Sequence, residues 1–234
     1  METDRPVGAA LEWQPARRPE PAVIEGRYVR LRPLSAATDA ESLYPESHPP
    51  AGDPWMWTYL PSGPYRDAAE MRAGLELSEV SEDPLFFTLL PLPGAQPAGV
   101  ASYLRITPEH GVIEIGHIWF GASLRRTRAA TEVIYLLAAH AFDDLGYRRL
   151  EWKCDSLNQA SRRAADRFGF SFEGVFRRHM VVKGRNRDTA WYAITGEDWP
   201  RIGAGMRAWL EPDNFDSDGH QRRPLAELIA SGGG

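Results

Sequence analysis

The hydrophobic positions of the chain change their period repeatedly, which predicts alternating strands and helices. Stretches where apolar residues alternate with polar ones, or run unbroken between turn residues, are typical of β-strands. They lie at residues 27–34, 85–90, 99–106, 112–120, 148–154, 170–182 and 188–195. Three-to-four spacing of apolar residues predicts helices at 35–44, 65–80, within 124–146, 158–168 and 198–210. This order predicts an α/β fold with a central sheet of mixed strand direction.

The composition of the chain predicts three parts. Residues 1–22 are rich in proline and charge and are expected to form an arm. Residues 23–210 carry the periodic segments and are expected to form one domain. Residues 211–234 are dominated by Pro, Asp, Ser and Gly, which predicts a flexible tail.

A basic turn between the 112–120 strand and the most apolar helix stands out. It contains Arg125, Arg126 and Arg128, followed by the small residues Ala129 and Ala130. The first N–H groups of a helix have no internal partner and attract anions. Arginine adds charge suited to phosphate oxygens, so the turn predicts a phosphate site. The alternative is a solvated helix start beside an ordinary core helix.

Charge and cysteine content narrow the possible functions. The net charge of −5 disfavours nucleic acid as the main partner, although a local positive pocket can still bind a small anion. Cys154 is the single cysteine, so no internal disulfide can form, and it is expected to be a small core residue. No apolar stretch suggests a membrane span or a secretion signal, and a cytoplasmic location is expected.

Three segments resemble one enzyme superfamily, the GNAT acyl-CoA-dependent N-acyltransferases. The 125–130 turn resembles its pyrophosphate loop, 158–170 resembles the helix beside the pantetheine arm, and 25–33 resembles the first strand. The branch most resembled contains the ribosomal-protein N-terminal acetyltransferases. The resemblance implies a twisted, mostly antiparallel sheet flanked by helices and splayed between its fourth and fifth strands. It also implies acetyl-CoA as donor, an amine on a peptide or small molecule as acceptor, and possible homodimers.

The resemblance implies which residues hold acetyl-CoA. Backbone groups of 127–130 would bind the pyrophosphate with help from the arginines, and the strand at Ile118 and Trp119 would bind the thioester end. Arg128 stands where the loop usually has a glycine, so an altered loop shape is expected. The residues implied for cofactor binding are Ile118, Trp119, Arg125, Arg126, Thr127, Arg128, Ala129, Ala130 and Asn158.

Glu114 and Ser161 are the implied catalytic residues. A carboxylate among apolar neighbours suits a general base, and Glu114 matches the family's base; the alternative is a glutamate on the solvent face of its strand. His117 is a second candidate base. Ser161 lies one helical turn after Asn158 and would protonate the departing thiolate. The alternative is that Ser161 is a polar surface residue and Asn158 only an N-cap.

The acceptor side is less defined. The aromatic residues Trp55, Trp57 and Tyr59 are predicted to line the acceptor pocket. The charged turn at 183–188 is interpreted as solvated, with contact to an acidic acceptor as the alternative. No spacing suggests a metal site. A transferase of another acyl group such as succinyl, and an acyl-CoA sensor without turnover, remain alternative functions.

Overall fold

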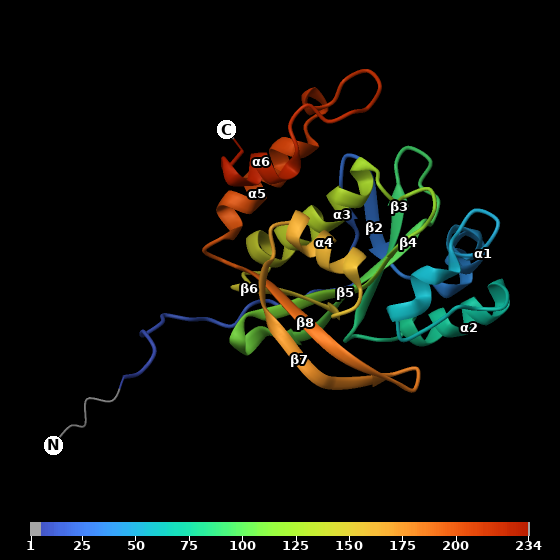
Figure 1. The fold of residues 1–234 in the computed structure, drawn as a ribbon, viewed down its shortest axis with the longest axis horizontal. Coiled ribbons are helices and arrows are strands. Elements are labelled where there is room, and N and C mark those ends of the chain that lie inside the picture. The colour runs from blue at the N-terminus through green and yellow to red at the C-terminus, as the bar shows by residue number, and fades with distance from the viewer. Residues whose placement is uncertain (1–5, 234) are drawn as a thin grey trace.

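The structure of the chain, a computed structural model, describes residues 6–233. Eight strands form one sheet in the order β1-β2-β3-β4-β5-β6-β8-β7 (Figure 1). The strands are β1 (Ile24–Glu25), β2 (Val29–Pro33), β3 (Leu85–Pro91), β4 (Gly99–Thr107), β5 (Val112–Phe120), β6 (Arg149–Asp155), β7 (Ser171–Val182) and β8 (Arg185–Thr195). All neighbours are antiparallel except β5 and β6. The predicted fold class is therefore confirmed.

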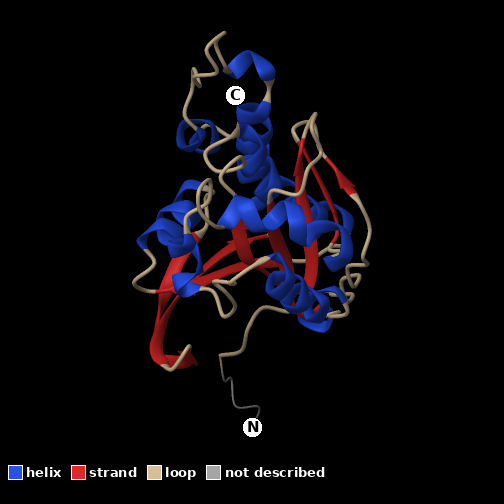
Figure 2. Ribbon diagram, turned by 90° about the vertical axis from the view of Figure 1, so that its right-hand side faces the viewer, coloured by secondary structure: helices blue, strands red, loops and turns tan. Residues whose placement is uncertain are grey.

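Helices cover both faces of the sheet (Figure 2). They are α1 (Ala36–Ser47), α2 (Ala68–Glu79), α3 (Arg128–Ala139), α4 (Gln159–Arg167), α5 (Trp199–Leu210) and α6 (Leu225–Ala230), with the short 3₁₀-helices η1 (Pro54–Tyr59), η2 (Pro108–His110) and η4 (Pro212–Asn214) and the π-helix η3 (His140–Asp144). Because side chains alternate along a strand, Val100 packs with α1 and α2, whereas Ala101 packs on the side of α3. No helix among the described residues is long and apolar enough to cross a membrane.

Two features of β5 create the site. Its parallel pairing with β6 stops at Glu114 and Glu151, and beyond that point the two strands separate. Its pairing with β4 jumps from Gly116 to Trp119, so His117 lies in a β-bulge with a positive φ of 48°. The predicted splay between the fourth and fifth long strands is therefore present at β5 and β6.

The two ends of the chain differ in how they meet the domain. Residues 6–22 form no helix or strand, and Trp13 donates through Nε1 to the Glu109 carbonyl (2.9 Å). The segment from 211 to 233 is not the expected flexible tail. Leu228 and Ile229 are buried, and α6 lies so close to α5 that a Cβ on Gly205 would be 2.5 Å from Ile229 Cα. The sequence analysis missed α6 because its apolar face is short and the residues around it are mostly polar.

Candidate active site

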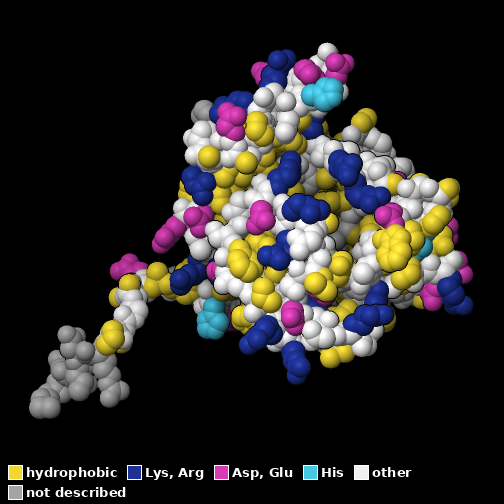
Figure 3. Space-filling view, in the orientation of Figure 1, with side chains coloured by type: hydrophobic (Ala, Val, Ile, Leu, Met, Phe, Trp, Pro, Cys, Tyr) yellow, Lys and Arg dark blue, Asp and Glu magenta, His cyan; other side chains and the backbone are white. Residues whose placement is uncertain are grey.

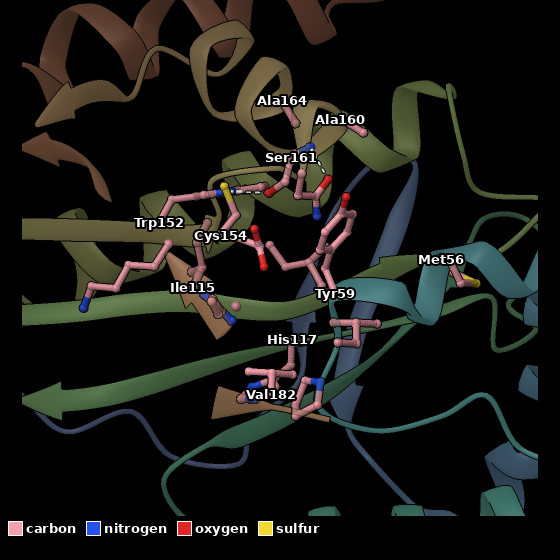
Figure 4. Close-up of a pocket in the computed structure, with 18 of the residues that line it drawn as sticks. Met56, Tyr59, Ile115, His117, Trp152, Cys154, Ala160, Ser161, Ala164 and Val182 are labelled. Carbon is pink, nitrogen blue, oxygen red and sulfur yellow. Dashed lines mark hydrogen bonds between the residues drawn. The ribbon is translucent and has the colours of Figure 1, made fainter. Parts of the chain in front are cut away.

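A cavity of about 520 Å³ opens where β5 and β6 separate (Figure 4). Its walls come from β5, β6, the start of α4, the η1 segment and the β7–β8 hairpin. Ser161 and His117 lie on opposite sides of it. The splay thus opens space for a ligand between two strands whose backbone groups are no longer paired with each other.

The basic turn ends in a helix start with free donors. Thr127 caps α3, because its Oγ1 accepts from the Ala130 N–H (3.2 Å). Among the described residues, the backbone N–H groups of Arg126, Arg128 and Ala129 have no acceptor. Arg126 carries the positive φ of the turn, 63°, whereas Arg128 is already helical. A glycine is therefore not required at residue 128, and these N–H groups can bind an anion.

The Arg128 side chain points away from the phosphate turn. Its guanidinium lies 4.0 Å from the centre of the Phe215 ring and 5.6 Å from that of Tyr28. Both contacts are of the cation–π kind. Arg128 thus joins the start of α3 to the C-terminal segment through its contact with Phe215. Of the three arginines of the turn, Arg125 lines the cavity.

His117 faces the cavity from the bulge of β5. The Ser102 hydroxyl donates to the Gly116 carbonyl (3.1 Å), and the same oxygen lies 2.9 Å from His117 Nδ1. A hydroxyl has one proton, so Nδ1 carries the hydrogen of this second contact and Nε2 keeps a free lone pair. Burial, with smaller contributions from Arg105 and Arg187, lowers the pKa of His117 below 6.5. The imidazole is therefore neutral near pH 7.

Glu114 is buried rather than on a solvent face, which excludes that alternative. Its side chain is 4% exposed and Oε2 lies 2.5 Å from Arg105 Nη1 and 2.9 Å from Lys153 Nζ. Lys153, 2% exposed, also pairs with Glu151 (2.5 Å). This cluster of charges lies where β5 and β6 separate, and its ion pairs join the two strands there. Glu114 also lines the cavity.

Ser161 and Asn158 lie together at the start of α4. Asn158 Oδ1 accepts from the Ser161 N–H (3.1 Å), so it is the N-cap that the alternative describes, and its side chain also lines the cavity. Ser161 Oγ accepts from Trp152 Nε1 (2.9 Å), which leaves its own proton to donate.

Burial raises the pKa of the Cys154 thiol, and a smaller effect of hydrogen bonding to Ser161 lowers it. Cys154 is buried, as expected, but it also borders the cavity.

The comparisons with known proteins agree with this geometry. Residues 29–171 match the family model described as an acetyltransferase (GNAT) domain. The chain belongs to the GNAT acetyltransferase family. The crystal structure of a GCN5-related N-acetyltransferase from Brucella melitensis is 45% identical, with a TM-score of 0.91, over 94% of this chain and 99% of that chain. A probable GNAT acetyltransferase from Chromobacterium violaceum is 40% identical, with a TM-score of 0.76, over 85% and 99%.

More distant relatives of this GNAT acetyltransferase share its fold. One is the Salmonella typhimurium acetyl transferase described as modifying the N-terminal serine of ribosomal protein L7/L12. It is 21% identical, with a TM-score of 0.63, over 74% of this chain and 98% of that chain. None of the curated proteins searched matches the chain. The family model and the two more similar structures confirm the resemblance to this superfamily. They do not identify the acceptor.

The GNAT acetyltransferase has an aromatic wall that differs from the predicted one. Tyr59 and the exposed Trp55 line the cavity. Trp57 does not: it is 2% exposed and packs against Tyr65 and Trp119, with ring centres 5.3 and 5.4 Å away. Trp119 is likewise buried, in one hydrophobic cluster with Trp57. Of the two β5 residues predicted to bind the thioester, Ile118 therefore lines the cavity and Trp119 does not.

Several cavity residues of the GNAT acetyltransferase were missed by the sequence analysis. They are the charged residues Arg105, Lys153 and Arg187, and beside the cavity the buried Ser102, which orients His117. All lie in strands where a polar residue ordinarily faces solvent, and only the strand splay places them around a cavity. Among residues 6–233, the one group of three side chains spaced to hold a metal ion is on the C-terminal loop, outside this cavity, at Asp216, Asp218 and His220.

Proposed function

We propose that the chain transfers the acetyl group of acetyl-CoA directly to a primary amine. The observation that carries the proposal is that the Ser161 hydroxyl and the His117 imidazole, whose pKa is lowered by burial, lie on opposite sides of one cavity. The phosphate turn lies at the start of the helix that follows β5, and Arg125 joins it to the same cavity. Direct transfer then requires only that acetyl-CoA and the amine enter the cavity from its two ends.

Acetyl-CoA would be held by backbone donors and by the splay. Its pyrophosphate would accept from the free N–H groups of Arg126, Arg128 and Ala129, with Arg125 pairing from the side. The pantetheine arm would run between β5 and α4, past Ile118 and Asn158. Its amide groups would then pair with the β5 backbone that β6 leaves free.

The reaction needs two proton transfers. The amine nitrogen attacks the carbonyl carbon of the thioester, and one of its protons passes to His117 Nε2. The carbon–sulfur bond breaks with its electron pair on sulfur, and the Ser161 hydroxyl protonates that sulfur. His117 releases its proton to water and Ser161 recovers one, so the products are the N-acetyl amine and the free thiol of CoA.

For the general base, the structure favours a residue other than the first candidate, Glu114. Two cations, Arg105 and Lys153, contact Glu114 through Oε2. A proton taken up by this carboxylate would therefore compete with two ion pairs. His117 Nε2 has no such partner among the described residues. We therefore propose His117 as the base and Glu114 as the group that fixes the cations beside it.

Acetyl-CoA binding is the first test. In calorimetric titration, Arg125→Ala is expected to weaken acetyl-CoA binding about tenfold, the typical value of a charge-assisted hydrogen bond. Arg72→Ala removes an exposed arginine of α2 and is expected to leave binding unchanged. No binding of acetyl-CoA would contradict the proposal. Tight binding without acetylation across an amine panel would favour the sensor function, and succinyl-CoA in the same titration tests the other acyl group.

The pH dependence identifies the base. Because His117 acts only when neutral and its pKa lies below 6.5, the acid limb of kcat/KM should fall below pH 6.5. His117→Gln should lower the rate by about 10²-fold or more and remove that limb. A limb that persists in His117→Gln and disappears in Glu114→Gln would assign the base to Glu114 instead.

A further inference from the structure

Away from the phosphate turn, the cations that line the cavity differ in how they are paired. The cations there are Arg105, Lys153 and Arg187. Arg105 and Lys153 both pair with Glu114, and Lys153 pairs with Glu151 as well. Glu151 also pairs with Arg149. The other carboxylates that line the cavity, Asp53 and Asp155, form no ion pair with Arg187 among the described residues, so Arg187 is the unpaired cation of this group.

Arg187 is held in place without being neutralised. Its Nε donates to Thr189 Oγ1 (3.2 Å), a fully buried hydroxyl on the same strand. No carboxylate among residues 6–233 forms an ion pair with it, and its two terminal nitrogens have no acceptor there. An arginine whose Nε is fixed presents its terminal nitrogens as a pre-organised fork that suits a carboxylate.

The guanidinium of Arg187 belongs to the cavity in which the proposed reaction takes place. Arg187 lines the same cavity as His117, and its charge contributes to the lowered pKa of that imidazole. It stands on β8, whereas Arg125 of the phosphate turn follows β5, so the two unpaired arginines of the cavity come from different walls. Several Lys and Arg side chains also border the hollow in the face shown in Figure 3.

We propose that the acceptor is an anionic amine, a primary amine with a carboxylate a few bonds away that binds in the fork of Arg187. The inference rests on the proposed transfer of an acetyl group to an amine at this site. A carboxylate on Arg187 would place the amine of a short molecule within reach of His117 Nε2. A free amino acid and an acidic peptide terminus share this chemistry.

Matched acceptors test the inference. Each free α-amino acid is compared with its own primary amide, and an alanyl-aspartyl peptide amide with the alanyl-asparaginyl one, in acetyl transfer from acetyl-CoA. The wild-type protein should favour the carboxylate member of a pair by about tenfold or more in kcat/KM. Arg187→Gln should remove that preference, measured as the ratio of kcat/KM for the two members of a pair in the same variant. The free amino acids and the peptides distinguish the two sources of the carboxylate.

The control is a neighbour on the same hairpin. Arg185→Gln removes an exposed arginine of β8 and should keep the preference. Equal rates on both members, turnover confined to neutral amines, or a preference that survives Arg187→Gln would overturn the inference. So would the absence of turnover on every carboxylate acceptor while acetyl-CoA still binds in calorimetry. Failure to bind acetyl-CoA would instead count against the proposed function.

Discussion

Glu132 offers the sharpest test of how the site is supported. It lies in the helix that follows the phosphate turn, is 5% exposed, and accepts three backbone N–H groups. Oε1 binds the Arg27 amide (2.9 Å), and Oε2 binds those of Tyr28 (2.6 Å) and Val29 (2.9 Å). A Cβ on Gly26 would be 2.6 Å from Oε2, so the turn before β2 closes tightly on this carboxylate.

The size of the effect follows from the three contacts. A buried N–H that loses its acceptor costs about 1–3 kcal/mol, so Glu132→Ala should lower the free energy of unfolding by about 3–5 kcal/mol. Glu132→Gln keeps one oxygen, which can retain the two bonds made by Oε2, and should cost about 1–2 kcal/mol. Since domains are stable by roughly 5–15 kcal/mol, the alanine variant should unfold at clearly lower urea concentration.

Urea unfolding followed by tryptophan fluorescence measures this difference. The control is Glu41→Ala, which removes an exposed glutamate of α1 and should change the free energy of unfolding by less than about 0.5 kcal/mol. A loss below about 1 kcal/mol for Glu132→Ala, or equal losses in both variants, would refute the reasoning. Unchanged slopes of the transitions would show that the comparison is valid.

Three further predictions follow from single contacts. Ser161→Ala should lower kcat by about 10-fold or more without changing acetyl-CoA affinity, because the thiolate loses its proton donor; an unchanged kcat on a turned-over amine would exclude that role. Lys183 donates to the carbonyls of Trp57 (2.8 Å), Ser62 (2.9 Å) and Gly63 (2.6 Å) and so joins the β7–β8 hairpin to the segment 57–63, which contains the cavity-lining Tyr59. Lys183→Met should raise the acceptor KM about tenfold, with acetyl-CoA binding unchanged in calorimetry and partial rescue by Lys183→Arg. Gly205→Ala should force α6 from α5 and lower Tm by several degrees in a thermal melt, whereas no shift would mean that the two helices separate without cost.

Local signals in the sequence were sufficient for most of the fold. The strands and helices arise where hydrophobic periodicity and turn residues coincide, so their order and approximate bounds could be predicted. The prediction of a flexible C-terminal tail was wrong because α6 is a short helix that buries only a few residues, and the sequence around it is polar. Such a segment is stabilised by packing on α5 rather than by its own helix propensity.

In the candidate active site too, features formed by residues adjacent in sequence could be predicted, and features that depend on distant residues could not. The phosphate turn and the Asn158–Ser161 pair are continuous in sequence, so their local geometry could be anticipated. The direction of Arg128 could not be, because Phe215 decides it from the other end of the chain. Nor could the burial of Trp57, which depends on Tyr65 and Trp119.

The sequence by itself determined the order of the elements, the family and the position of the phosphate turn, because these depend on residues close together in the chain. The tertiary structure decided which charges are paired and which are free. Glu114 and Lys153 are neutralised only because β5 and β6 diverge beside them, and Arg187 is left unpaired only because its hairpin folds over the resulting cavity. Charge pairing depends on distances between side chains of separate strands, and those distances exist only once the sheet has formed.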